Sequence, residues 1–493
     1  MNKINLKSTL YFFLAILFLS IKSYAKNDYD SSKISEQTKE IVKRIEKINI
    51  LMGEFVGQAP RRPQQYENFE ELKKKTSFEE LRMLTDHPNG VVRCYAFWAL
   101  AHNENVDLFS IVKTHLIDDA TIETLFGCTG SVEKVGDVFI NIVTPKYFDL
   151  NIKKLNEKES KALDSLLIYK NNNLDSRFTA IENVEINELL YPRIRELVTK
   201  FHNQSALATL SKYRKENDIQ LILKNKGEDK SFFYTYKAIQ NFPDSKFFPL
   251  LEKNLMQTLD NDHFDYDWRE LYKAIATYKN TKAVDLLTIP FTKVKHQNIK
   301  KYHIDFIYDA ILVNESSLYD DLLWKIWEEE NIITLKGFKY LLKTNPSKTY
   351  ELSKQNLLKN YNGNHENVTP FIDESIFADG LKETMLNFIL ANERNLAYNI
   401  ISNQILESDV HDFEMYCKKV LELKETTFVE PLFKRLQTEN NPNVYLQIVE
   451  TLISFKDKDI NKRILETRKE NKNMNQNWGS DSLDQILEKN NIK

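Results

Sequence analysis

Three of the nine histidines lie close enough in the sequence to supply ligands to one metal ion, namely His87, His102 and His115. A helix of 12 residues is about 18 Å long, so His102 and His115, expected at opposite ends of one helix, cannot share a metal. His87 and His115 could meet beside three carboxylates, a set that suits zinc: Asp86, Asp118 and Asp119. The alternative is loop-end histidines with helix-capping aspartates. We favour that alternative and predict no metal or cofactor site.

Closely spaced carboxylates also occur in LDNDHFDYDW, residues Leu259–Trp268. Spaced aspartates in a loop can bind calcium, but an EF-hand loop needs a glycine turn and a closing glutamate, and neither is present here. We therefore predict a solvated loop between helices, with an aspartate at the N-cap of the following helix.

The three cysteines, Cys94, Cys128 and Cys417, are too few for a disulfide scaffold. A 32-residue step places Cys128 at the position of Ala96, a small buried site on a helix. We predict that all three are buried, unreactive thiols and not redox groups.

Three of the eleven glycines fall within ten residues: Gly127, Gly130 and Gly136. Glycine permits backbone shapes that other residues rarely adopt, and loops on a rigid scaffold often carry binding residues. The nearby charged residues are Glu133, Lys134 and Asp137, and the following VFINIV is rich in residues typical of strands. We predict a partner-binding loop from these six residues. The alternative is an irregular connector whose glycines serve the fold alone.

No catalytic motif accompanies these residues. The sequence has no GxSxG, HExxH, CxxC, phosphate-binding P-loop or GxGxxG pattern. We therefore assign no catalytic residue and expect a protein that is not an enzyme.

The elements that would position such a loop are predicted to be helices. Glycine and proline together number 23 of 493 residues, below average usage and too few for turn-rich β-folds or glycine-dependent nucleotide folds. Long amphipathic stretches separated by short polar breaks indicate an all-α protein.

The N-terminus has the layout of a cleavable secretory signal. Lys3 and Lys7 precede the apolar run Leu10–Leu19, and Ser23-Tyr24-Ala25 ends the segment. Cleavage after Ala25 leaves 65 basic and 71 acidic residues, which provides no basic field to attract nucleic acid. We expect an exported protein, periplasmic or extracellular, with no stable membrane insertion after cleavage.

A repeat runs through the middle of the chain. The tetrad YKAI occurs at Tyr236–Ile239 and Tyr272–Ile275, and YDAI follows at Tyr308–Ile311, each 36 residues after the last. Each tetrad precedes a polar turn and a second apolar pair: Leu250-Leu251, Leu286-Leu287 and Leu322-Leu323. The shared alanine suits a close helix crossing. A period of 32–36 residues predicts an α-solenoid of antiparallel helix hairpins, because single hairpins cannot bury their apolar faces.

The stretch 84–119 resembles a HEAT repeat. The residues that carry the resemblance are Asp86, Pro88, Val92, Arg93, Ala96, Ala99, Leu100, Val106, Leu108, Ile111 and Leu116. The resemblance implies that aspartate and arginine pair between helix ends, which would make both structural. This chain has one extra residue between Asp86 and Arg93, and across 150–470 the resemblance is one of architecture alone.

These observations predict five segments along the chain. They are a signal peptide (1–25), an N-terminal helix and connector (26–65), HEAT-like hairpins with the glycine-containing loop (66–145), an irregular helical-repeat array (146–470) and a polar tail (471–493). Pro346 and residues 362–370 are the expected breaks within the array.

The sequence leads to two hypotheses for function. The first is an exported helical-repeat scaffold that binds a protein or peptide partner without catalysis, an inference from fold class. The alternative is an exported enzyme acting on polysaccharide, in which helical hairpins close into an (α/α) toroid around a pocket with two acids or an acid–tyrosine pair.

Overall fold

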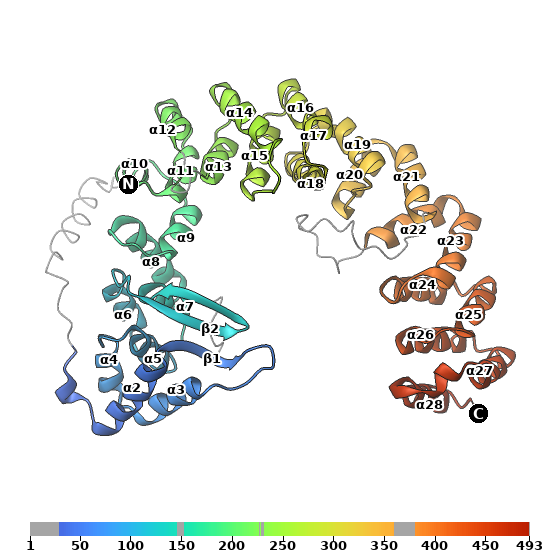
Figure 1. Cartoon of the computed structure of the whole chain (residues 1–493), viewed down its shortest axis with the longest axis horizontal. Helices are drawn as coiled ribbons and strands as arrows, with labels where there is room; N and C mark the ends of the chain where they lie inside the picture. Colours follow the sequence, from blue (N-terminus) through green and yellow to red (C-terminus); the bar gives the residue numbers. More distant parts are fainter. Residues whose placement is uncertain (1–28, 145–151, 226, 228–230, 359–379, 493) are drawn as a thin grey trace, which may run out of the picture. The chain divides into compact units, whose positions relative to one another are not determined.

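The computed structural model describes residues 29–144, 152–225, 227, 231–358 and 380–492, coloured along the chain in Figure 1. Internal contacts divide the chain after Phe242 into two compact units, here called unit 1 and unit 2. Both are predominantly α-helical, and the described part of unit 1 also holds a three-stranded sheet. The all-α prediction is confirmed as fold class, although the sheet was not predicted. The signal segment 1–25 lies outside the described residues.

Unit 1 begins with helices, a strand and further helices, and the sheet is completed late. Its elements are η1 (Ser31–Lys33), α2 (Glu36–Ile48), β1 (Ile50–Val56), α3 (Gln64–Lys75), α4 (Phe78–Leu84), α5 (Gly90–Ala101), α6 (Leu108–Thr114), β2 (Thr121–Gly127), β3 (Thr129–Lys134), α7 (Val135–Val143), α8 (Glu157–Tyr169), α9 (Ser176–Asn183), α10 (Tyr191–Phe201), α11 (Gln204–Ser211), η2 (Glu216–Asp218), α12 (Ile219–Lys224) and α13 (Phe233–Asn241).

Unit 2 is helical throughout its described residues. Its elements are η3 (Ser245–Phe247), α14 (Phe248–Thr258), α15 (Asp267–Ala276), α16 (Thr281–Thr288), α17 (Pro290–Lys293), α18 (Gln297–Val313), η4 (Ser317–Tyr319), α19 (Asp320–Glu330), α20 (Leu335–Thr344), α21 (Pro346–Leu358), α22 (Leu381–Asn392), α23 (Arg394–Glu407), α24 (Val410–Leu423), η6 (Thr426–Phe428), α25 (Val429–Leu436), α26 (Pro442–Ile453), α27 (Lys458–Glu470), η7 (Lys472–Asn475) and α28 (Asn477–Lys489).

In each unit the helices pack against helices that are near them in the sequence. In unit 1, α11 lies against both α10 and α13; in unit 2, α15 lies against α18, and α24 lies against α26. The repeated tetrads fall on α13, α15 and α18, and their alanines are fully buried: Ala238, Ala274 and Ala310. The leucine pairs fall on α14, α16 and α19. In two of the three repeats the tetrad helix packs against the helix with the leucine pair, α15 against α16 and α18 against α19. The solenoid of antiparallel hairpins stays a prediction.

Local sequence signals explain several of the element boundaries. α4 begins with a capping box, in which the Ser77 side chain accepts from the Glu80 N–H and the Glu80 carboxylate accepts from the Ser77 N–H. α2 ends at Ile48, because Asn49 adopts a left-handed conformation with φ 53°. The chain then turns into β1, within the segment expected to be a helix and connector.

Three segments differ from what the sequence suggested. VFINIV forms the buried helix α7 and not a strand, since its apolar residues cover the adjoining helices. The expected polar tail contains α28, whose Leu483 is fully buried. Pro346 begins α21, where its missing N–H costs no helical hydrogen bond. The contacts divide the chain at Phe242 and not at Pro346, and residues 362–370 lie outside the described part.

Candidate functional site

The predicted glycine-containing loop is a β-hairpin followed directly by a helix. β2 and β3 pair antiparallel, and Gly127 and Cys128 form the two-residue turn between them. Gly127 has φ +58°, as expected for the first turn position of a type II′ hairpin. Cys128 is exposed in this turn, so the prediction that it is buried on a helix is wrong. The 32-residue step fails here because a hairpin stands where it required a helix.

The other two cysteines behave as predicted. Cys94 and Cys417 are buried, and burial raises the pKa of each thiol, to about 12 for Cys417. A thiol that stays protonated is a poor nucleophile.

Two of the charged residues assigned to the predicted loop bond within unit 1. Glu133 accepts a hydrogen bond from Thr124 Oγ1 at 3.0 Å and from Asn141 Nδ2 at 3.2 Å. Lys134 Nζ lies 2.6 Å from the Asp175 carboxylate, which precedes α9. These contacts fasten the end of β3 to α7 and α9.

Gly136 and Asp137 fasten the start of α7. A Cβ atom at Gly136 would lie 2.7 Å from the backbone oxygen of His115, so the glycine permits a close approach. The buried Asp137 carboxylate accepts from the N–H groups of Asp175 and Ser176, at 2.9 and 2.8 Å, and from the Ser176 hydroxyl. Asp137 therefore holds the start of α9.

Gly130 differs from these residues. A Cβ atom there would meet its nearest neighbour at 3.7 Å, an ordinary contact distance. The fold therefore does not require glycine at position 130. The structure brings the six predicted residues into one segment, but the exposed part of that segment consists of the turn and residues 129–132.

The three strands form a sheet in the order β1-β2-β3, with one face against helices (Figure 1). Ile122 and Thr124 of β2 are buried on this inner face. The Phe126 ring lies 6.3 Å from that of Trp98 on α5, and a Cβ atom at Gly53 would lie 2.7 Å from the Phe126 ring. The inner face is thus part of the core of unit 1.

The opposite, outer face of the sheet is apolar but not buried. Register and side-chain alternation place Ile50, Glu123 and Val132 in one row across the three strands, with Met52 and Leu125 in the next. Val132 is 67% exposed, Ile50, Met52 and Leu125 are half-buried, and Glu123 is exposed. The solvent-facing side of a sheet is usually polar, so these four apolar residues make the outer face a candidate contact surface.

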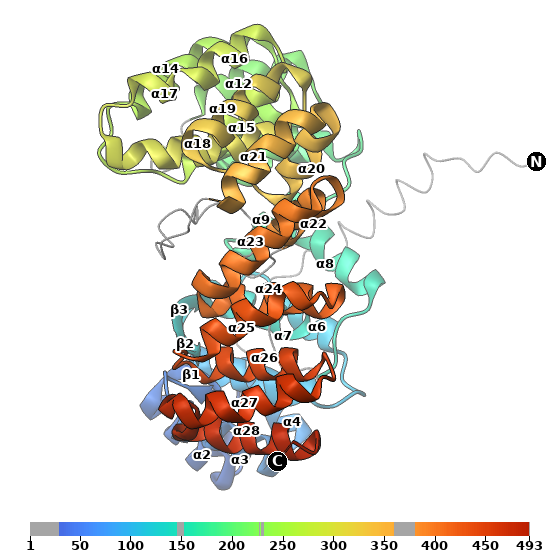
Figure 2. The same cartoon turned by 90° about the vertical axis from the view of Figure 1, so that its right-hand side faces the viewer.

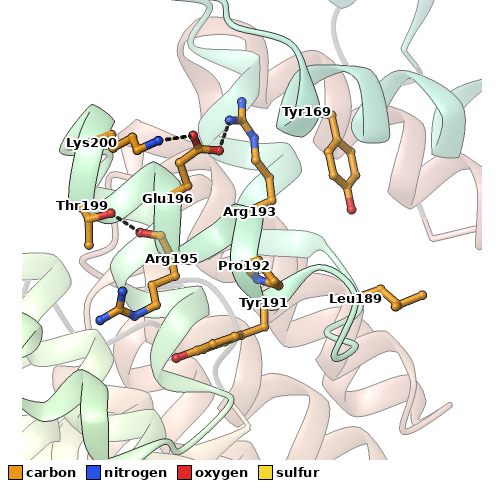
Figure 3. Close-up of a pocket in the computed structure, with 9 residues that line it drawn as sticks. All are labelled: Tyr169, Leu189, Tyr191, Pro192, Arg193, Arg195, Glu196, Thr199 and Lys200. Atoms are coloured by element: carbon orange, nitrogen blue, oxygen red, sulfur yellow. Dashed lines mark hydrogen bonds and ion pairs between the residues drawn. The ribbon is translucent and has the colours of Figure 1, made fainter. Parts of the chain in front are cut away.

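A second candidate is a hollow of about 780 Å³ beside α10, shown in Figure 3. The described residues that line it are Tyr169, Leu189, Tyr191, Pro192, Arg193, Arg195, Glu196, Thr199 and Lys200. The Glu196 carboxylate lies 2.8 Å from Arg193 and 3.1 Å from Lys200, as the dashed lines show. Arg195 and the Tyr191 hydroxyl bind the carboxylate of Asp218, which is 1% exposed. Arg193, Arg195 and Lys200 already form ion pairs with carboxylates of unit 1. This hollow is therefore a weaker candidate for a binding site than the sheet.

The histidine group predicted to be structural is bonded as loop-end residues. His115 lies 3.4 Å from Asp118 and 3.8 Å from Asp86, and Arg93 donates to Asp118 at 3.0 Å. His87 accepts from the Asn89 N–H, and burial lowers the pKa of His87 to about 4. In the described part of the chain, no three metal-ligating side chains lie close enough to hold an ion.

The aspartate-rich segment 259–268 is a loop that leads into α15. Asp262 bonds to His263 at 2.7 Å, and both side chains are strongly exposed. Asp265 accepts from the Asp267 N–H at 2.9 Å, near the start of α15. The exposed loop agrees with the prediction, but the predicted aspartate N-cap is wrong, because Tyr266 occupies the N-cap of α15 and makes no side-chain capping bond.

Sequence reasoning missed a buried polar pair on α18. His303 is fully buried and its Nδ1 lies 2.6 Å from the Tyr272 hydroxyl; burial lowers its pKa to about 4. Asp305 is 1% exposed, and neither carboxylate oxygen has a hydrogen-bond partner among the described residues. Burial raises its pKa to about 7, with Lys301 opposing the change and Glu330 adding to it. His303 and Asp305 belong to no repeated motif, so nothing in the sequence indicated that these polar side chains are buried.

Comparison with known proteins adds no relative, because no family model, curated protein or solved structure matches the chain significantly. Among the helices of the described residues, none is both long and apolar enough to cross a membrane.

Proposed function

We propose that this chain is an exported, non-catalytic helical-repeat scaffold that binds a protein or peptide partner through the outer face of the unit 1 sheet. The observation that carries the proposal is the apolar outer face itself. Val132 is the most exposed of its apolar residues, and Ile50, Met52 and Leu125 extend the surface across all three strands.

Two observations support a HEAT-like, stacked arrangement of hairpins. The first is the hydrogen bond from Arg93 on α5 to Asp118, the counterpart of Asp86 one 32-residue step later. The second is the placement of three successive tetrad alanines at buried helix crossings. Stacked hairpins form a rigid support, and a rigid support holds a binding surface in shape without ordering cost.

The test is capture of partners from the exported fraction of the source organism, with purified wild-type protein as bait. Val132→Glu places a charge on the outer face, and Val313→Glu makes the same change at a 59% exposed residue of α18. We expect Val132→Glu to abolish capture of a partner that both wild type and Val313→Glu retain, with unchanged melting temperatures. Equal capture by both variants would contradict the assignment of the surface.

The alternative function, an (α/α)-toroid enzyme, needs two carboxyl groups, or one carboxyl group and a tyrosine, at the floor of a common pocket. Among the described residues lining the hollow beside α10, Glu196 alone has a carboxylate, and two cations hold it. Release of reducing sugars from polysaccharide by the purified protein would favour this alternative over the scaffold.

A further inference from the structure

The two edges of the unit 1 sheet differ in how their backbone groups are satisfied. At the β1 edge, the Tyr95 hydroxyl both accepts from the Met52 N–H at 2.8 Å and donates to the Met52 carbonyl at 3.0 Å. The Gln65 amide donates to the Ile50 carbonyl, and Val56 exchanges two backbone hydrogen bonds with Arg61. The β1 edge is therefore closed by residues of unit 1.

Within the described residues, the β3 edge has no comparable closure. The two-residue turn makes Phe126 and Thr129 a hydrogen-bonded pair, and alternation then directs the N–H and C=O of Gly130 and Val132 away from β2. No hydrogen bond to these four groups is present within the described residues. The order β1-β2-β3 makes β3 an edge strand, and the three strand labels follow one another in this order in Figure 2.

The exposed part of this edge is short and firmly held. Residues 129–132 are all exposed, which leaves both sides of the strand open to solvent. Directly after them, Lys134 bonds to Asp175, and Asp137 holds the start of α9. An exposed edge strand in a fixed position is a template for pairing with another chain, and such edges are usually blocked.

We propose that an extended segment of the partner adds to this sheet as a fourth strand along β3, by hydrogen bonds to the backbone of Gly130 and Val132. This inference rests on the proposed function, since it defines how the partner binds at the same surface. Gly130 suits the role because its lack of a side chain leaves the backbone accessible, although the fold does not require glycine there.

The outer face of the sheet favours a basic side chain in the partner segment that is added along β3. Val132 lies directly between the added strand and the exposed Glu123 carboxylate on β2. A lysine or arginine beside Val132 can lay its methylene stem over the valine and bring its charge to Glu123. Strand addition of this kind combines main-chain hydrogen bonds for affinity with alternate side chains for specificity.

A second copy of the chain fits the edge less well than a peptide. The open edge is four residues long, and strand pairing of that length buries far less than the roughly 1,200 Å² of a stable protein interface. An extended peptide needs no more than this edge and the adjoining outer face.

The test uses a synthetic nine-residue peptide in which Lys alternates with Thr and Val, blocked at both ends. We expect it to bind full-length mature protein and to slow amide hydrogen exchange at Gly130 and Val132. A peptide with Glu in place of each Lys, and one with every second amide N-methylated, should each bind at least about tenfold more weakly. Failure of the Lys peptide to bind, or equal binding of the N-methylated peptide, would overturn the proposal.

The matched variants are Val132→Pro and Val132→Thr. Proline removes the outward N–H but no hydrogen bond to β2, whereas threonine keeps the N–H and the branched shape. We expect about tenfold weaker binding for Val132→Pro and little change for Val132→Thr. Gly130→Pro repeats the test at the other position should Val132→Pro lower the melting temperature.

Two further results would separate this inference from the proposed function. Loss of partner capture in Val132→Glu, together with full capture and peptide binding by both proline variants, would leave the scaffold function and exclude strand addition. A concentration-dependent dimer by sedimentation, with Gly130 and Val132 protected from exchange before peptide is added, would assign the edge to a second copy and overturn the peptide proposal.

Discussion

The Tyr272 hydroxyl of α15 lies 2.6 Å from Nδ1 of His303 on α18, the helix that bears the next repeated tetrad. Tyr308 occupies the same tetrad position on α18, and its hydroxyl lies 3.0 Å from the side chain of Thr334, the N-cap of α20. Two of the three tetrad tyrosines thus bond to a later helix of unit 2 or to its N-cap residue. In both cases a buried tyrosine links its own helix to one that follows in the sequence, which favours the same residue type at each step.

We predict that Tyr272→Phe lowers the free energy of unfolding by about 1–3 kcal/mol. The change leaves Nδ1 of the fully buried His303 without its partner, and a buried unpaired polar group costs this much. Urea denaturation followed by circular dichroism measures the effect. Tyr169→Phe, at a 49% exposed tyrosine, is the control and should be close to neutral. Equal effects would show that the Tyr272 hydrogen bond contributes nothing.

Two glycines of the predicted binding segment should respond differently to alanine. Gly136→Ala brings a Cβ atom within 2.7 Å of the His115 backbone oxygen and 2.9 Å of Leu174, so we expect a loss of about 1–3 kcal/mol. Gly130→Ala meets only ordinary contact distances and should stay within about 0.5 kcal/mol of wild type. Thermal melts of the two variants measure the difference. The reverse order would mean that Gly130, and not Gly136, serves the fold.

The repeats and the sheet show what the sequence could and could not predict. The tetrads were readable because burial of an alanine and a tyrosine recurs at an equal step, and that regularity survives in α13, α15 and α18. The sheet could not be predicted from the sequence, because β1 lies about 70 residues from β2 and their parallel pairing depends on the helices between them.

The sequence indicated which segment holds the candidate site, but not which of its side chains face solvent. Three clustered glycines indicated an unusual backbone, and the segment does turn sharply at Gly127. The expectation that Glu133, Lys134 and Asp137 offer contacts to a partner remains a prediction, although each now has partners within unit 1. Sequence alone could not separate these residues from Val132, because which face a strand residue occupies depends on its register with β2.

The capping role of Asp137 leads to a prediction about stability. Asp137→Ala removes the acceptor for the Asp175 and Ser176 N–H groups, so we expect a loss of roughly 1–3 kcal/mol. Lys158→Ala, at an exposed position of α8, is the control and should change stability little. If peptide binding fell in Asp137→Ala while stability was unchanged, Asp137 would belong to the binding surface and not to the scaffold.

The buried Asp305 leads to a prediction about pH. Its pKa is about 7 in the folded protein, and an unfolded aspartate has a pKa near 4. Between these values the folded state holds a proton that the unfolded state has released, so this group stabilises the fold at low pH. The free energy of unfolding therefore falls as pH rises through that window, and above it the ionised, buried carboxylate of Asp305 destabilises the fold.

Asp305→Asn replaces the carboxyl group by a neutral amide of similar shape. We expect the variant to exceed wild type in free energy of unfolding at pH 8, by up to about 4 kcal/mol for a shift of this size, and to approach it at pH 4. His303, whose lowered pKa acts in the opposite direction below about pH 6.5, is present in both proteins and cancels in the difference. Asp321→Asn, on an exposed position of α19, controls for loss of a surface charge. Urea titrations at half-unit steps from pH 4 to 8 measure the curve. A difference that stays constant across this range would show that Asp305 is ionised in the folded protein throughout it.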